Sequence, residues 1–187
     1  MTAEKKLKLN IGCGDHRLPG YEGVDILRGN AVDYVCDLEN GNLPFQDNSV
    51  EAIYCSNVLE HIQNLPGLMA EFHRICCGGA VMEIIVPHCS GIGAFQDPTH
   101  RRFFSYNSFE YFTKNDEFPS YDFQNNFEIV NKKICFVRTP KDISDYLKHP
   151  FKAFFELTFN FFPNFYENSF LRIFPATDLR VKLRVAK

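Results

Sequence analysis

Residues 9–26 read LNIGCGDHRLPGYEGVDI, an apolar run that passes through Gly12-Cys13-Gly14 and reaches an acid, Asp25, inside a second apolar run. Glycines let the backbone turn sharply beneath a ligand, and a helix starting just beyond would present free N–H groups. A carboxylate at the end of the next strand can accept hydrogen bonds from both hydroxyls of a ribose. This stretch therefore predicts a strand, a ligand-binding turn and a second strand.

The glycine pattern is shorter than the dinucleotide-binding fingerprint. G-x-G-x-x-G would place a third glycine at position 17, where the chain has Arg17. A G-x-G turn followed by an acid is a less specific sign of a nucleotide-binding site than the full fingerprint. The residues alone leave two interpretations open, a cofactor site or a plain strand-to-loop turn with acids on the surface.

The composition is that of an ordinary globular chain. Its 187 residues suffice for one domain, and we expect a single domain over 1–187. Hydrophobic residues make up 45% and charged residues 23%, which is typical of soluble proteins. The net charge of -3 offers no basic field for a phosphate backbone, which argues against a nucleic-acid partner. The oligomeric state is left open.

The cysteines and the lengths of the apolar runs indicate the cellular compartment to expect for the protein. The chain has 7 cysteines, an odd number, with no C-x-x-C pair, and the opening MTAEKKLKLN has no apolar signal core. We expect a reduced, cytoplasmic protein whose thiols behave mostly as small hydrophobes. There is no apolar run of about 18 residues, so no membrane span is expected.

A strand–helix–strand unit is predicted in the middle of the chain. Asn64 is a suitable N-cap, apolar residues follow at 3–4 spacing, and Gly78-Gly79 would stop the helix. Flanking strands at 50–55 and 80–86 complete a parallel βαβ unit. The run AVMEIIVP at 80–87 is almost continuously apolar, as expected of a strand buried on both faces.

The two ends of the predicted sheet differ. Too few residues separate Ile26 from Val32 for a crossover helix, so the helices of the first half should be abbreviated. DLRVKLRV at 178–185 alternates apolar and basic residues, which indicates an antiparallel strand with one wet face, and 125–137 reads as an edge strand or hairpin. The fold class is α/β, Rossmann-like, with a mostly parallel sheet and an antiparallel end.

Several stretches together resemble the class I S-adenosylmethionine-dependent methyltransferases, in particular the small methyltransferase-11-like group. They are LNIGCG, GVDI, CDLENGNLPFQDNSVEAIYCSNVLEHI, the GG before AVMEIIVP, DPTHRRFFSYNSFEYF and RIFPATDLRVKLRV. The resemblance implies a seven-stranded sheet whose last strand is antiparallel, and S-adenosylmethionine as cofactor.

The resemblance also implies roles for particular residues. The glycine turn would wrap the methionine and ribose part of the cofactor, Asp25 would take the ribose hydroxyls, and Asp37 would lie by the adenine. Val58 to His61 would lead into the substrate side. The implied cofactor-binding residues are Asn10, Gly12, Cys13, Gly14, Asp25, Ile26, Asp37, Leu38, Ser56 and Asn57.

Methyl transfer from a sulfonium is an in-line displacement that needs a base only when the nucleophile carries a proton of high pKa. His61 and His100 stand near predicted strand ends and are the candidate catalytic residues. Alternatively, His61 only packs beside the cofactor loop. His88 adjoins Cys89, but with no second pair at ligand spacing we expect no metal site.

The sequence argues against some classes of methyl acceptor but does not identify the acceptor itself. Related nucleobase and amide N-methyltransferases often carry a proline-proline-aromatic loop where this chain reads SNVLEH. This favours a small-molecule, glycan or lipid-linked acceptor.

The Phe-rich segment 150–174 is predicted to be helical, with a stripe that contains Phe151, Phe154, Phe155 and Phe162. Three interpretations stay open. It packs on the sheet, forms a lid over an apolar substrate, or touches a membrane surface or a second subunit.

The sequence therefore predicts a methyltransferase that moves a methyl group from S-adenosylmethionine to such an acceptor. Two alternatives remain at this point, a non-catalytic module that binds the same cofactor and a nicotinamide-dependent oxidoreductase.

Overall fold

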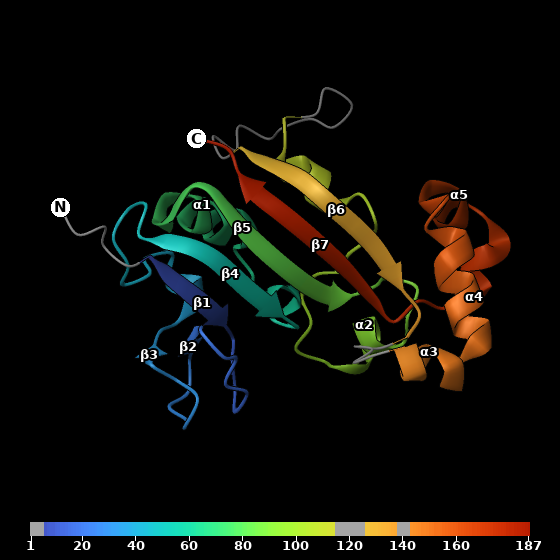
Figure 1. Cartoon of the computed structure of the whole chain (residues 1–187), viewed down its shortest axis with the longest axis horizontal. Helices are drawn as coiled ribbons and strands as arrows, with labels where there is room; N and C mark the ends of the chain where they lie inside the picture. The colour runs from blue at the N-terminus through green and yellow to red at the C-terminus, as the bar shows by residue number, and fades with distance from the viewer. Residues whose placement is uncertain (1–5, 115–125, 138–142) are drawn as a thin grey trace.

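The computed structural model describes residues 6–114, 126–137 and 143–187, and the first five residues lie outside it. Seven strands form one sheet in the order β3-β2-β1-β4-β5-β7-β6 (Figure 1). The strands are β1 (Leu7–Ile11), β2 (Glu22–Asp25), β3 (Tyr34–Val35), β4 (Val50–Ser56), β5 (Cys76–Pro87), β6 (Phe127–Cys135) and β7 (Asp178–Val185).

The direction of the strands confirms the predicted fold class. β7 pairs antiparallel with both β5 and β6, and the pairs among β1 to β5 are all parallel. This is the mostly parallel, Rossmann-like α/β sheet with a reversed last strand. Its parallel strands end along one edge, which is where ligands bind in such sheets.

The helices are short. They are α1 (Leu65–Ile75), α2 (Gly93–Gln96), α3 (Ile143–Lys148), α4 (Pro150–Phe159) and α5 (Pro163–Asn168), with 3-10 turns η1 (Leu38–Asn40), η2 (Leu59–His61), η3 (Ser108–Phe112) and η4 (Phe170–Ile173). No helix among them is long and apolar enough to cross a membrane, within the part of the chain that the structure describes.

Helix α1 begins where predicted but ends earlier. The Asn64 side chain accepts a hydrogen bond from the Gly67 N–H and so caps the first turn. The helix stops at Ile75, and Cys76 already has extended backbone and pairs with Val50. The prediction that Gly78-Gly79 ends the helix is wrong, because the sheet captures the chain first and both glycines lie inside β5.

The first half of the sheet has abbreviated connections, as predicted. Residues 12–21 and 26–33 form no α-helix, so the helix start expected beyond Gly14 is absent. The N–H of Gly14 donates instead to the Asp25 carboxylate. β3 has only two residues and pairs in parallel with β2.

One face of the sheet is covered and the other is largely open, toward the viewer in Figure 1, where α1 lies behind the strands. The prediction that residues 80–87 are buried on both faces is therefore only partly right. Glu83 is exposed and lies opposite Lys182 of β7, whereas Ile84 to Pro87 are buried. Without a helix to bury it, this half of the strand needs no apolar side chains on the open face.

The Phe-rich segment is helical, as predicted, but the predicted stripe is only partly its packed face. Phe155 packs against the core and stacks on Phe159, whereas the other rings of the stripe do not. Phe151, Phe154 and Phe162 are 79%, 61% and 67% exposed. The buried rings are Phe159 and Tyr166, which pack on Phe136 at the end of β6. Phenylalanines occupy several sides of α4, so their spacing did not identify the packed face. In Figure 1, α4 and α5 lie beyond the end of β6.

Candidate active site

The glycine turn after β1 is in direct contact with Asp25, the acid at the end of β2. The Asp25 carboxylate accepts one hydrogen bond from the Gly14 N–H at 2.8 Å and another from the Leu27 N–H at 3.1 Å. A carboxylate has about four acceptor positions, so two remain for a ligand. Ile26, beside it, is 59% exposed and offers an apolar surface at the same strand end. A carboxylate next to an exposed apolar side chain fits a ribose carrying an adenine.

Gly12 and Gly14 both have left-handed backbone, with φ of 64° and 51°. A Cβ atom on Gly12 would lie 2.2 Å from Cγ2 of Val58, whereas one on Gly14 would meet nothing within 4 Å. The turn after β1 therefore packs directly against the loop after β4, and glycine at position 12 makes that contact possible.

Two of the predicted cofactor residues face inward. The Asn10 side chain is 5% exposed, and its Nδ2 donates to the His16 carbonyl at 3.0 Å. The Cys13 thiol is buried, and burial raises its pKa, so it remains a neutral thiol. These two residues hold the turn from within.

The remaining predicted cofactor residues lie at the ends of β3 and β4. Asp37 caps η1 by accepting from the Glu39 N–H, and Leu38 belongs to the core. Asn57 has left-handed backbone, with φ of 54°, and its side chain lies 3.2 Å from the Ser56 hydroxyl. The carboxyl ends of β1 to β4 thus gather these residues along one edge of the sheet.

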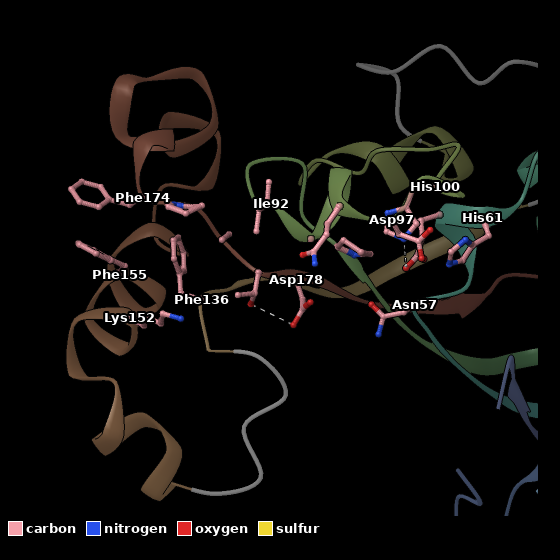
Figure 2. Close-up of a pocket in the computed structure, with 18 of the residues that line it drawn as sticks. Asn57, His61, Ile92, Asp97, His100, Phe136, Lys152, Phe155, Phe174 and Asp178 are labelled. Carbon is pink, nitrogen blue, oxygen red and sulfur yellow. Dashed lines mark hydrogen bonds and ion pairs between the residues drawn. The ribbon is translucent and has the colours of Figure 1, made fainter. Parts of the chain in front are cut away.

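A cavity of about 930 Å³ opens next to this edge. Of the predicted cofactor residues, only Asn57 lines it. Figure 2 shows Asn57 and His61 at one end and the rings of Phe155 and Phe174 at the other. The cavity is therefore a second compartment that adjoins the predicted cofactor site and is polar at the near end and aromatic at the far end.

The structure brings the two predicted catalytic histidines together, with ring centroids 4.8 Å apart. Nδ1 of His100 lies 2.8 Å from the carbonyl oxygen of Ala94, so it carries the proton and Nε2 has the free lone pair. Nδ1 of His61 lies 2.9 Å from Oγ1 of Thr99, and that hydroxyl donates to Asp97. His61 therefore also donates through Nδ1 and keeps a lone pair on Nε2.

Sequence reasoning missed Glu60, one of whose carboxylate oxygens lies within 4.8 Å of a ring nitrogen of each histidine. Its side chain is 1% exposed, and neither carboxylate oxygen has a hydrogen-bond partner among the described residues. Nε2 of His100 lies 3.9 Å from Oε1 of Glu60. Burial raises the pKa of Glu60 to about 7. The signal was a charged residue directly after the apolar pair Val58-Leu59, in a turn that packing would bury.

Other polar residues from the same motifs have structural partners. Both ring nitrogens of His88 are engaged, Nδ1 with Ser90 and Nε2 with Glu167 at 2.8 Å. The side chain of Arg102 donates to the backbone carbonyl of Ile62 at 2.8 Å. This geometry ties the DPTHRRFF loop to the turn that carries Glu60 and His61.

The comparisons with known proteins bear on this arrangement. A family model described as "Methyltransferase domain" matches residues 22–84, which include Asp25, Asn57 and His61. No curated protein sequence matches the chain.

Among solved structures, an S-adenosylmethionine-dependent methyltransferase from Archaeoglobus fulgidus is 15% identical with a TM-score of 0.58, over 97% of this chain and 86% of that one. A second, from Mesorhizobium loti, is 14% identical with a TM-score of 0.58, over 98% and 93%. At these identities the likeness shows the fold alone. The methyltransferase-domain match over residues 22–84, together with a fold shared with S-adenosylmethionine-dependent methyltransferases, supports methyl transfer from S-adenosylmethionine as the activity of this chain.

Proposed function

We propose that this methyltransferase acts on a lipid-linked acceptor that places an apolar part against the aromatic end of the 930 Å³ cavity and a nucleophile at its polar end. The observation that carries this proposal is the division of the cavity into those two ends. Small acceptors without an apolar part and free glycans would leave the aromatic wall unused.

The far end of the cavity has the chemistry of a site for an amphipathic molecule. The rings of Phe155 and Phe174 lie 4.5 Å apart and, with Phe136, form an apolar wall. Lys152 lines the same end and supplies a positive charge, which suits a phosphate in the acceptor (Figure 2). In this arrangement 150–174 is one wall of the acceptor site within a single domain over 1–187.

The near end has the groups that a methyl acceptor needs. S-adenosylmethionine, when bound, supplies a methyl carbon whose bond to the positive sulfur breaks as the acceptor oxygen or nitrogen bonds it, leaving the electron pair on sulfur. Asp25 and the glycine turn hold the adenosyl part, and Asn57 marks the passage to the cavity. His61 and His100 hold the nucleophile and, through a free Nε2 lone pair, take its proton.

The test supplies methyl-labelled S-adenosylmethionine with three acceptor pools: a lipid extract, a small-molecule extract and free glycans. We expect label in the lipid pool. Phe174→Ser should raise the KM for that acceptor, while Phe170→Ser should not, because Phe170 is 82% exposed and lies outside the cavity lining. Label only in the small-molecule or glycan pool would contradict the proposal, as would equal effects of the two variants.

A further inference from the structure

We infer that the polar end of the cavity is a site for one divalent transition-metal ion, bound by Glu60, His61 and His100. One ring nitrogen of each histidine and one carboxylate oxygen of Glu60 lie within 4.8 Å of one another. Glu60 and His61 come from η2, directly after β4, and His100 comes from the loop after α2. The fold thus brings three side chains that can bind a metal together at the wall of the cavity.

Hydrogen bonds to the Nδ1 atoms orient the two histidine rings as metal ligands. Each ring donates its Nδ1–H, His100 to the Ala94 carbonyl and His61 to the Thr99 hydroxyl. Thr99 in turn donates to Asp97. Histidines that bind metals are usually fixed in this way, with the second ring nitrogen bonded to a carbonyl or to a carboxylate-linked group.

Glu60 supplies an independent observation. Its carboxylate is buried, with no hydrogen bond to either oxygen among the described residues. A buried polar group without a partner is costly, and structures normally satisfy it. The neighbouring Arg101 and Arg102 side chains donate to Gln63 and Ile62 rather than to this carboxylate. A cation held between this carboxylate and one ring nitrogen of each histidine, all within 4.8 Å of one another, would supply the partner that Glu60 lacks.

The donor set selects the kind of ion. Two imidazoles and one carboxylate suit zinc, cobalt, manganese or iron, whereas magnesium prefers oxygen ligands alone. Ligands around one such ion lie roughly 3.4 Å apart. Nε2 of His100 and Oε1 of Glu60 are already 3.9 Å apart, so small side-chain rotations complete the site. Three protein ligands leave open positions that face the cavity.

The consequence for catalysis rests on the proposed function, although the metal site does not. An acceptor hydroxyl at an open position would lose its proton more easily, because a bound cation lowers the pKa of a coordinated oxygen. With the ion bound, His61 and His100 would act as its ligands instead of taking the proton themselves, and the proton would leave to solvent through the cavity.

A second group of metal-ligating residues, His88, Cys89 and Glu167, is a useful internal control. Both ring nitrogens of His88 already have partners, and its Nε2 lies 2.8 Å from Glu167. This cluster is satisfied without an ion, so we expect it to stay metal-free.

The experiment strips the full chain of metal with a chelator and titrates it with Co²⁺. We expect one equivalent to give visible d–d absorption without the near-ultraviolet charge-transfer band of a thiolate ligand. Zn²⁺ should displace the signal and Mg²⁺ should not. A thiolate band, or no saturable Co²⁺ signal, would overturn the inference.

Variants locate the site. Glu60→Gln and His100→Ala should each weaken Co²⁺ binding at least about tenfold. His149→Ala and Cys89→Ser should leave it unchanged, because His149 is exposed outside the cavity and Cys89 belongs to the other cluster. Equal loss in all four variants would overturn the proposal. Circular dichroism checks folding, and calorimetric binding of S-adenosylhomocysteine separates failure of the metal site from failure of the cofactor site.

Discussion

Replacing Gly12 by alanine should destabilise the protein in two separable ways. The position has φ of 64°, and left-handed backbone costs a non-glycine residue roughly 1–2 kcal/mol. The new Cβ would also lie 2.2 Å from Cγ2 of Val58, and overpacking of this kind costs roughly 1–3 kcal/mol. Gly12→Ala should therefore lower the free energy of unfolding by about 2–5 kcal/mol.

Gly14→Ala is the matched control for the backbone part. Its φ is 51°, but a Cβ there meets nothing within 4 Å, so only the cost of about 1–2 kcal/mol is expected. Urea unfolding of both variants, and of Gly12→Ala combined with Val58→Ala, measures the difference. The double variant should recover the overpacking part through a favourable coupling energy. Equal losses for the two glycine variants together with zero coupling would refute the packing of the turn against the loop after β4.

Three further predictions follow from other parts of the structure. Asp25→Ala should lower the calorimetric affinity for S-adenosylhomocysteine at least about tenfold, since hydrogen bonds to a charged group contribute roughly 1.5–3 kcal/mol, while Glu51→Ala on the open face should not change it. Hydrogen bonding to Arg74 lowers the pKa of the buried Glu71, so its contribution is present above the usual glutamate pKa and is lost as the pH falls. Chemical unfolding should thus show Glu71→Gln destabilised by about 1.5–3 kcal/mol at neutral pH with a smaller deficit in acid, and a deficit that grows in acid would contradict this. Asn64→Ala should cost about 1 kcal/mol by thermal unfolding, because it removes the cap of α1, and an unchanged midpoint would argue against the cap.

The fold could be predicted where the information is local. Alternation along 178–185 marked a strand with one wet face, and the Asn64 cap marked the start of α1, because both depend on neighbouring residues. The end of α1 could not be read in the same way. It depends on the pairing of Cys76 with Val50, which lies on another strand.

The candidate site was predictable only in part for the same reason. Asp25 could be proposed from its distance to the glycine turn, but its direct bond to Gly14, which stands where a helix start was expected, is a tertiary contact. Glu60 looked like an ordinary polar residue, because its burial depends on a loop about forty residues later that carries His100. Tertiary packing brings Glu60, His61 and His100 together, and the spacing of these residues along the chain does not predict it.

We propose that cofactor and acceptor occupy adjoining compartments at the carboxyl ends of the strands. A crystal structure of the protein with S-adenosylhomocysteine tests this arrangement most directly. We expect the ribose hydroxyls on the Asp25 carboxylate and the sulfur at the Asn57 end of the cavity, with the aromatic end left free. A ligand seated against Phe155 and Phe174, with no contact to Asp25, would contradict the account.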